Sequence, residues 1–270
     1  MIPLKDQDLI RQKFVAELIE PVKIDYFTER ESALTVPGRK PCAYCKPTRE
    51  MLHELSSLSD LISLRIHIFE EAVEERAKLG IDRIPGIVLR GASARAQQAG
   101  APTANGVSFK FYGMPGGTEF PAFLESIVDI SRGEILLSKE SVKELKKLRE
   151  ETLLRVFVTP TCGYCPQMMR LAYQLSLANP KVRAEVIEVN EFPELGERYG
   201  VRAVPLTVIA DKVAIPGAVQ ETVLVEQVLT AADADTSAPS REVGPTSAVA
   251  REEPPPVQRG EQRPSGLIIP

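Results

Sequence analysis

The sequence predicts an α/β fold with a mixed sheet, built from two copies of one unit. Apolar residues alternate between helical and strand-like spacing along most of the 270-residue chain. The same order of elements occurs twice: helix, strand, helix, strand, helix, strand, strand, helix. Each copy contains two cysteines that enclose two residues, and 43 positions separate Cys42 from Pro85 and Cys162 from Pro205. A chance pair of such motifs would not share that spacing.

In the first copy, the residues after Cys42 are expected to form an amphipathic helix that opens at this cysteine. Met51, Leu52, Leu55 and Leu58 fall on one face of that helix. Gly80 is a typical helix stop. The expected elements are a helix over 4–20, a strand over 22–27, the helix after Cys42, a strand over 63–69, a short helix ending at Gly80, a strand within 80–90, a return strand reaching Gly113 and a helix over 118–131.

The second copy repeats this order. Ser138 and Ser141 supply N-cap chemistry for its first helix. The helix after Cys162 carries Met168, Leu171, Leu175 and Ala178 on one face. The expected elements are a helix over 138–151, a strand over 154–159, the helix after Cys162, a strand over 183–189, a short helix ending at Gly200, a hairpin that runs from 200–210 through a tight turn at 210–212 to Gly217, and a helix over 220–232.

The two copies differ by insertions in the first. Between the cysteines and the prolines, each residue of the first copy lies 120 positions before its match in the second. Upstream, 22–27 matches 154–159 at an offset of about 132. The difference places roughly a dozen extra residues before Cys42. Gly113 and Gly217 lie 104 apart, so about 16 small and polar residues at 91–106 are expected to form a flexible loop.

The organisation expected from these comparisons is two units and a tail. The first unit covers 1–133 with the CAYC motif, and the second covers 134–232 with the CGYC motif. Residues 233–270 are rich in Pro, Ser, Glu and Arg and poor in aromatics, which predicts a disordered tail.

Composition excludes several classes of function. A net charge of -4 gives no sign of a nucleic-acid partner. The N-terminus has an acidic residue early and no apolar run, so we expect no secretory signal. No stretch approaches the ~18 uninterrupted apolar residues of a membrane helix. We therefore expect a cytoplasmic protein, in which paired cysteines are more often catalytic or metal-binding than structural.

The cysteine pairs predict dithiol–disulfide exchange. A cysteine between a strand and a helix start meets free backbone N–H groups and the positive end of the helix dipole, which stabilise its thiolate. Cys162 is the expected nucleophile, and Cys165, one helical turn later, is the expected resolving thiol. Cys42 and Cys45 are expected to act in the same way, with Lys46 adding a positive charge nearby.

The two prolines fit the same chemistry. Pro205 and Pro85 each begin a strand that is expected to face the cysteine helix, and each is a candidate for a cis peptide bond. We expect the backbone of Val204 and Ile84 to pair there with an extended substrate segment.

The residues leave other interpretations of the cysteines open. Structural disulfides are disfavoured because a bridge across two residues closes a very small loop. A single zinc site is disfavoured because zinc-binding pairs are usually ~12–20 residues apart, although a zinc- or copper-binding protein stays an alternative. Inert core thiols, or a scaffold whose tail recruits partners, are two further alternatives.

At this point the motifs resemble known proteins. CGYCP after a VFVTPT strand, with Val-Pro before a later strand, resembles glutaredoxin and thioredoxin. The duplicated arrangement over about 4–232, with FYGMPGGTEFPAFLESIVDISRGE between the sites, resembles the protein disulfide oxidoreductases of thermophilic archaea and bacteria. The resemblance implies two tandem thioredoxin-like folds acting on protein disulfides, the C-terminal pair usually the more active. It also implies a thioredoxin reductase as electron donor.

The resemblance further implies a buried carboxylate near each resolving cysteine, to accept its proton. Glu188 matches the family pattern in the second unit, and Asp25 stands where thioredoxin has its acid. Tyr164 and Tyr44, between the cysteines, are expected to flank the substrate. His53 and His67 show no ligand pattern and are expected to be ordinary surface or core residues.

The function expected from the sequence is a protein dithiol–disulfide oxidoreductase that uses no cofactor beyond its redox-active disulfides. Reductase, oxidase and isomerase share this site, so the direction stays open. Expected partners are disulfide-containing proteins, a thioredoxin reductase and a peroxiredoxin, with no nucleic acid and no membrane. An electron carrier to a peroxidase is the alternative within enzymes.

Overall fold

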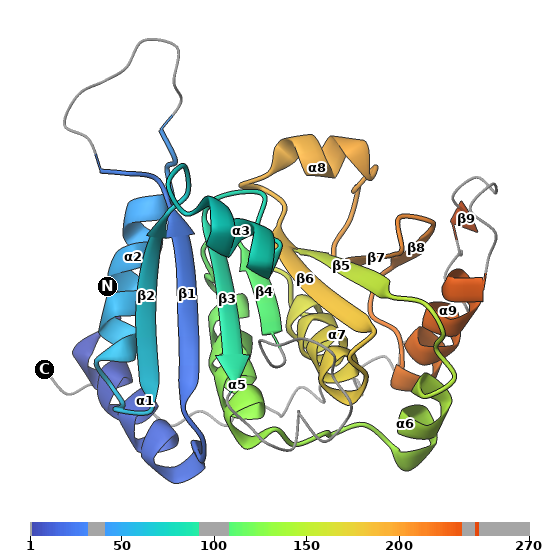
Figure 1. Ribbon diagram of the computed structural model, residues 1–270, viewed down its shortest axis with the longest axis horizontal. Helices are drawn as coiled ribbons and strands as arrows, with labels where there is room; N and C mark the ends of the chain where they lie inside the picture. Colours follow the sequence, from blue (N-terminus) through green and yellow to red (C-terminus); the bar gives the residue numbers. More distant parts are fainter. Residues whose placement is uncertain (1, 32–40, 92–107, 234–240, 243–270) are drawn as a thin grey trace, which may run out of the picture.

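The computed structural model describes residues 2–31, 41–91, 108–233 and 241–242. Its strands form one mixed sheet in the order β2-β1-β3-β4-β6-β5-β7-β8-β9 (Figure 1). The strands are β1 Val22–Thr28, β2 Ile62–Ile68, β3 Gly86–Gly91, β4 Ser108–Tyr112, β5 Thr152–Val158, β6 Val182–Glu188, β7 Leu206–Ile209, β8 Val213–Pro216 and β9 Arg241–Glu242. The helices are α1 Leu4–Glu17, α2 Cys45–Ser56, α3 Val73–Leu79, α5 Glu119–Arg132, α6 Lys139–Leu145, α7 Cys165–Ala178, α8 Pro193–Arg198 and α9 Glu221–Asp233.

The sheet contains the predicted repeat. In each half a central strand pairs in parallel with one neighbour and antiparallel with the next, β1 with β2 and β3, and β5 with β6 and β7. The halves join where β4 pairs in parallel with β6, from Lys110–Glu185 to Tyr112–Ile187. The two units therefore share one continuous sheet.

Side chains strengthen this junction on both faces. The Lys110 ammonium lies 3.4 Å from the Glu185 carboxylate. On the other face, Phe109 of β4 stacks on Tyr173 of α7 with ring centroids 4.4 Å apart, and the Tyr173 hydroxyl donates to the Lys110 C=O at 2.6 Å. A helix of the second unit thus packs on a strand of the first.

The strand register corrects the predicted offset between the units. Phe27 pairs with Gly86 and Phe157 with Leu206, so β1 matches β5 at an offset of 130 rather than about 132. A slip of two residues keeps every side chain on the same face of a strand, so the apolar pattern alone cannot detect it. The insertion before Cys42 is therefore 10 residues, not a dozen.

The sheet separates two apolar clusters. The larger lies on the face covered by α1, α2, α5, α7 and α9, and includes alternate residues of β1 such as Ile24 and Tyr26. The smaller lies under α3 and α8 on the opposite face and includes Phe27 and Phe157. Figure 1 shows α3 and α8 on the side of the sheet away from α5 and α7. Both cysteine-bearing helices, α2 and α7, therefore pack on one face.

Several helix boundaries differ from prediction, and α1 ends at Glu17 rather than at 20. Helices α2 and α7 begin at Cys45 and Cys165, the second cysteine of each pair, because the first cysteine lies in the turn that leads out of the strand. Helix α6 ends at Leu145 rather than near 151. Its predicted cap is confirmed, since the Ser138 side chain accepts from the Ser141 N–H at 3.1 Å.

The predicted loop and tail fall largely outside the described residues. Gly91 ends β3, and 92–106 are not described. Of the tail, Arg241–Glu242 forms β9 and pairs in parallel with Val213–Ala214 of β8. The unit boundaries stay predictions. Within the described chain, no helix is both long enough and apolar enough to cross a membrane.

Candidate active site

The two cysteine pairs lie at the same edge of the sheet. Strands β1, β4, β5 and β6 run parallel to one another, because β3 lies antiparallel between β1 and β4. Their carboxyl ends lead into four segments: 29–31 with the turn before α2, 113–118, 159–164 and 189–192. Residues far apart in the sequence therefore meet at this edge.

Each pair is closed as a disulfide. Cys42 bonds Cys45 and Cys162 bonds Cys165, with Cα atoms 5.4 Å apart in both. The first cysteine of each pair is half-buried, whereas Cys45 is 2% exposed and Cys165 is fully buried. An accessible first sulfur and a covered second sulfur are what attack and resolution require.

The second pair has a hydrogen bond aimed at its outer sulfur. The Cys165 N–H donates to the Cys162 Sγ at 3.1 Å, and the Cys162 N–H donates to the Thr159 C=O at 3.1 Å. Helix α7 continues for 14 residues from this point, with Pro166 in its first turn. Its N-terminal dipole and this N–H both favour a thiolate at Cys162.

The first unit reaches across to the second pair. The Thr118 hydroxyl lies 2.9 Å from the Cys162 C=O and 3.2 Å from the Pro160 C=O, and the Thr118 N–H donates to the same Pro160 oxygen at 2.8 Å. Gly117 has a φ of +49°, and a Cβ there would lie 2.2 Å from the Pro160 oxygen. The close approach of these two segments therefore depends on glycine.

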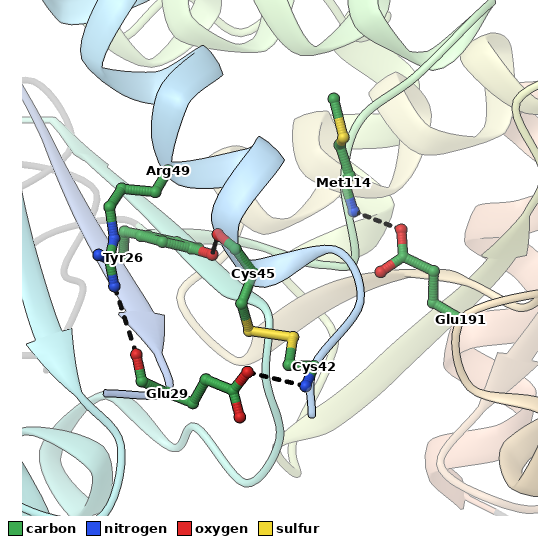
Figure 2. The surroundings of a disulfide bond; sticks show 7 residues. All are labelled: Tyr26, Glu29, Cys42, Cys45, Arg49, Met114 and Glu191. Atoms are coloured by element: carbon green, nitrogen blue, oxygen red, sulfur yellow. Dashed lines mark hydrogen bonds between the residues drawn. A yellow bond between two sulfur atoms is a disulfide. The ribbon is translucent and has the colours of Figure 1, made fainter. Parts of the chain in front are cut away.

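The first pair has different surroundings (Figure 2). The Cys42 N–H donates to the Glu29 carboxylate at 2.8 Å, and the buried Tyr26 hydroxyl donates to the Cys45 C=O at 2.6 Å. Burial raises the pKa of Tyr26 to about 12. Arg49 donates to the Glu29 C=O at 3.3 Å. The Lys46 side chain is 72% exposed, with its ammonium 4.0 Å from Glu50, so it points to solvent rather than to the sulfurs.

Both predicted cis peptides are present, at Ile84-Pro85 and Val204-Pro205. The ladders of β3 and β7 begin after these prolines, so neither Ile84 nor Val204 has a strand partner among the described residues. Tyr44 and Tyr164 are exposed, Tyr164 by 70%. The expected role of these six residues in substrate binding stays a prediction.

Three carboxylates gather between the two sites, and the sequence predicted only Glu188. It is buried, accepts from Asn190 and from the Glu191 N–H at 2.8 Å, and its pKa is raised by burial. Glu191 accepts from the Met114 N–H at 2.7 Å, and burial raises its pKa to about 7. Glu119 accepts from the Gly116 N–H at 3.1 Å, and burial raises its pKa to about 8.

Asp25 lies on the other face of the sheet. Side chains alternate along β1, so Tyr26 points toward Cys45 and Asp25 points away from it. The Asp25 carboxylate instead meets the His67 Nε2 at 2.8 Å and the Arg90 Nε at 2.7 Å. This arrangement does not bring Asp25 to Cys45, so it gives no support to the predicted proton transfer. His67 packs as an internal partner of Asp25 and Phe27, and His53 is exposed.

The described residues contain no group of three or more His, Cys, Asp or Glu side chains that could hold a metal ion. Each cysteine instead bonds the other cysteine of its own motif. The metal-binding alternative therefore finds no donor set in the described part of the chain.

Comparison with known proteins supports the fold. Residues 152–230 match the thioredoxin domain family. The F component of alkyl hydroperoxide reductase from Staphylococcus aureus is 26% identical over 161 residues, which are 59% of this chain and 27% of that protein. Its counterpart in Pseudomonas putida is 24% identical over 99 residues, 37% of this chain and 19% of that protein. The chain thus matches only about a quarter of the length of the first of these curated relatives and about a fifth of the second.

Two solved structures cover most of the chain. The NTD_N/C domain of alkylhydroperoxide reductase AhpF from Enterococcus faecalis (V583) matches with a TM-score of 0.71 and 21% identity, covering 84% of this chain and 100% of that one. A protein disulfide oxidoreductase from Aeropyrum pernix K1 matches with a TM-score of 0.70 and 22% identity. The match covers 86% of this chain and 94% of that one. The prediction of two tandem thioredoxin-like folds is confirmed.

Proposed function

We propose that the protein is a dithiol–disulfide oxidoreductase acting on protein disulfides. One observation carries this proposal: each unit places a closed cysteine pair at a helix start, with the first sulfur accessible and the second covered. The thioredoxin domain matched at 152–230 is consistent with it. The similar proteins from Staphylococcus aureus and Aeropyrum pernix carry redox functions in their names, which supports the same chemistry.

The second pair supplies the reaction in the reducing direction. The Cys162 thiolate attacks one sulfur of a substrate disulfide, forms a mixed disulfide and displaces the other sulfur as a thiolate. The Cys165 thiolate then attacks the Cys162 sulfur. The substrate leaves with two thiols, and the Cys162–Cys165 disulfide now lacks the two electrons that the substrate gained. The Cys165 N–H, 3.1 Å from the Cys162 sulfur, stabilises the Cys162 thiolate that starts this sequence.

Cys165 is fully buried and must lose its proton before it can resolve the mixed disulfide. Glu188 is the acceptor proposed from the sequence. Glu119 is a second candidate, because it follows Thr118, which contacts the Cys162 C=O, and because its raised pKa lets it exchange a proton near neutral pH.

The chemistry needs no organic cofactor, since the disulfides themselves carry the electrons. An external dithiol must reduce them, and we propose a thioredoxin reductase in the cytoplasm as its source. The substrate segment is proposed to bind across Val204-Pro205 beside Tyr164, and across Ile84-Pro85 beside Tyr44.

A second candidate function is electron transfer to a peroxidase. It is favoured by the curated relatives, which are named as components of an alkyl hydroperoxide reductase. In this case the substrate disulfide belongs to a peroxiredoxin, and the same exchange at Cys162 and Cys165 reduces it. The chemistry is shared, so the two candidates differ only in the partner.

The test is reduction of insulin disulfides driven by dithiothreitol, with Cys162→Ser and Cys42→Ser compared with the wild type. We expect an active wild type and a loss of at least tenfold in Cys162→Ser, with a smaller loss in Cys42→Ser. Wild-type rates in both variants would contradict the proposal. An inactive wild type that retains stoichiometric zinc would favour the metal-binding alternative. Peroxide consumption with a peroxiredoxin and thioredoxin reductase, far faster than insulin reduction, would favour the carrier.

A further inference from the structure

A buried hydroxyl is tied to the inner cysteine of the first pair. Tyr26 of β1 is fully buried, and its hydroxyl donates to the Cys45 C=O at 2.6 Å (Figure 2). Cys45 is the first residue of α2, so this bond joins the first turn of the helix to the sheet. Tyr26 is itself fixed, because β1 pairs there with Ile66 of β2 and with Ile87 of β3. The bond therefore connects Cys45 to a rigid part of the fold.

Two further hydroxyls belong to this place. Thr28 of β1 and Thr48 of α2 are fully buried. Burial raises the pKa of Tyr26 to about 12, and the Thr28 and Thr48 hydroxyls beside it act against this rise. Tyr26 consequently keeps its proton at neutral pH and acts as a hydrogen-bond donor, not as an acceptor of the thiol proton.

The second unit has an apolar side chain at each of these places. In the register and spacing that relate the units, the matched residues are Val156, Val158 and Met168, and all three are fully buried. Valine and methionine side chains donate no hydrogen bond, so none of the three repeats the contact at Cys165. The bond from a buried hydroxyl is thus a property of the first unit and not of the shared fold.

We propose that Tyr26 is a positioning residue for the first pair, whose hydroxyl holds Cys45 where its sulfur reaches Cys42. The role of Cys45 as the resolving thiol rests on the proposed function. In resolution, the Cys45 thiolate attacks the Cys42 sulfur of a mixed disulfide and displaces the substrate thiolate. Such an attack within one molecule is fast only while the reacting atoms are held close and aligned.

The bond acts in the open state of the pair. In the closed state the disulfide already fixes the two cysteines, with their Cα atoms 5.4 Å apart. The Tyr26 bond does not involve the sulfurs, so it is retained when the disulfide opens. Losing it lets the first turn of α2 sample more orientations, which slows resolution. The first attack is made by Cys42, which precedes the helix, and does not depend on this bond.

The experiment follows attack and resolution as separate steps, with glutathione disulfide as the substrate. The full chain carries Cys162→Ser and Cys165→Ser, so that only the first pair reacts. Reduced protein is mixed with glutathione disulfide, quenched in acid at intervals and analysed by mass spectrometry. Attack by the Cys42 thiolate adds one glutathione to Cys42 and releases the other as a thiolate. Resolution by the Cys45 thiolate closes the disulfide and releases the second glutathione, and the two electrons lost by the pair are carried by the two glutathione thiolates.

Tyr26→Phe keeps the ring and loses the hydroxyl. We expect resolution to slow about three- to tenfold, so that glutathionylated Cys42 accumulates, while attack changes less than about twofold. The slowing should be the same factor from about pH 6 to 9, because Tyr26 exchanges no proton in this range. The matched control is Tyr173→Phe, which loses a buried hydroxyl bond of the same length, to the Lys110 C=O, and should leave both rates unchanged.

A second replacement carries the test where Tyr26→Phe does not fold. At position 26, p-aminophenylalanine offers a weaker N–H donor in the same place, so its resolution rate should lie between those of the parent and Tyr26→Phe. Resolution at the parent rate in every folded variant, or an equal slowing in Tyr173→Phe, would overturn the role of Tyr26. A Cys42 that acquires no glutathione would instead show that the proposed function fails at the first pair.

Discussion

The Thr118 hydroxyl donates to the backbone C=O of Cys162 at 2.9 Å, and so links the first unit to the active site of the second. The contact comes from the turn between β4 and α5, within the first unit. The second site is therefore assembled from both halves of the chain, although its cysteines and its proline all lie in one half.

This contact predicts the effect of Thr118→Val. The variant keeps the shape of the side chain and loses its hydroxyl, which costs about 0.5–1.5 kcal/mol and loosens the turn that carries Cys162. We expect a two- to tenfold slower insulin reduction through the second pair, measured in a Cys42→Ser background. Thr230→Val loses a similar hydroxyl bond, to the Glu226 C=O on the exposed face of α9, and should leave the rate unchanged. Equal rates of insulin reduction in both variants would contradict the proposal that the Thr118 hydroxyl supports the turn that carries Cys162.

The next prediction concerns the close approach of Gly117 to Pro160. Alanine at this position would add a Cβ 2.2 Å from the Pro160 oxygen, which is too close for a non-bonded contact. It would also strain the left-handed backbone that glycine adopts there. We expect Gly117→Ala to lower the free energy of unfolding by about 3 kcal/mol in urea titrations. Gly163→Ala is the control for stability, since a Cβ there meets no atom within 4 Å. A Gly117→Ala variant as stable as the control would show that the two segments separate easily.

The local pattern predicted the described helices and strands of both units and the place of each cysteine pair at a helix start, but not β9 in the expected tail. Each cysteine pair and its cis proline lie within one unit, so the distance between them along the chain is the same in both units and can be read from the sequence. The two-residue slip in β1 shows the limit of this approach, because period-2 patterns repeat at every second residue.

Three carboxylates near the cysteine pairs could not be found from the local pattern, because their contacts join segments that are distant in the sequence. Glu119 and Glu191 come together only because β4 pairs with β6, a contact between units that no local pattern encodes. Glu119 also opens α5, where an acidic residue is ordinary helix chemistry. Glu29 contacts Cys42 across 13 positions that include the insertion. Asp25 lies on the face of β1 away from Cys45, because its neighbour Tyr26 occupies the face toward that cysteine, and the local pattern does not show which face that is.

The buried Glu119 predicts a pH-dependent stability. Its pKa rises from an ordinary 4.5 to about 8 on folding, so the folded state binds a proton that the unfolded state releases. The resulting stability is complete below about pH 4.5 and is lost as the pH rises through about 8. We expect the free energy of unfolding of the wild type to fall relative to Glu119→Gln between pH 5 and 8, by at most about 1.4 kcal/mol per pH unit.

The matched control for this experiment is Glu194→Gln, which removes an exposed carboxylate from α8. Its stability should follow the wild type across the same range. Parallel curves for the wild type and Glu119→Gln would show that Glu119 is ionised in the folded protein, and would remove it as a proton acceptor for Cys165.

The last prediction is that Asp25 contributes to the stability of the fold but not to the pH dependence of the first cysteine pair. Its carboxylate is buried and meets both Arg90 and His67, so Asp25→Asn leaves the Arg90 charge without its partner and should lower the free energy of unfolding by about 3 kcal/mol. Asp82→Asn breaks an ion pair of an aspartate that is 63% exposed and should cost less than about 1 kcal/mol. Because Asp25 faces away from Cys45, the pH dependence of first-pair reduction in a Cys162→Ser background should be the same in Asp25→Asn and the parent. A shifted pH profile would support Asp25 as the acid of the first site.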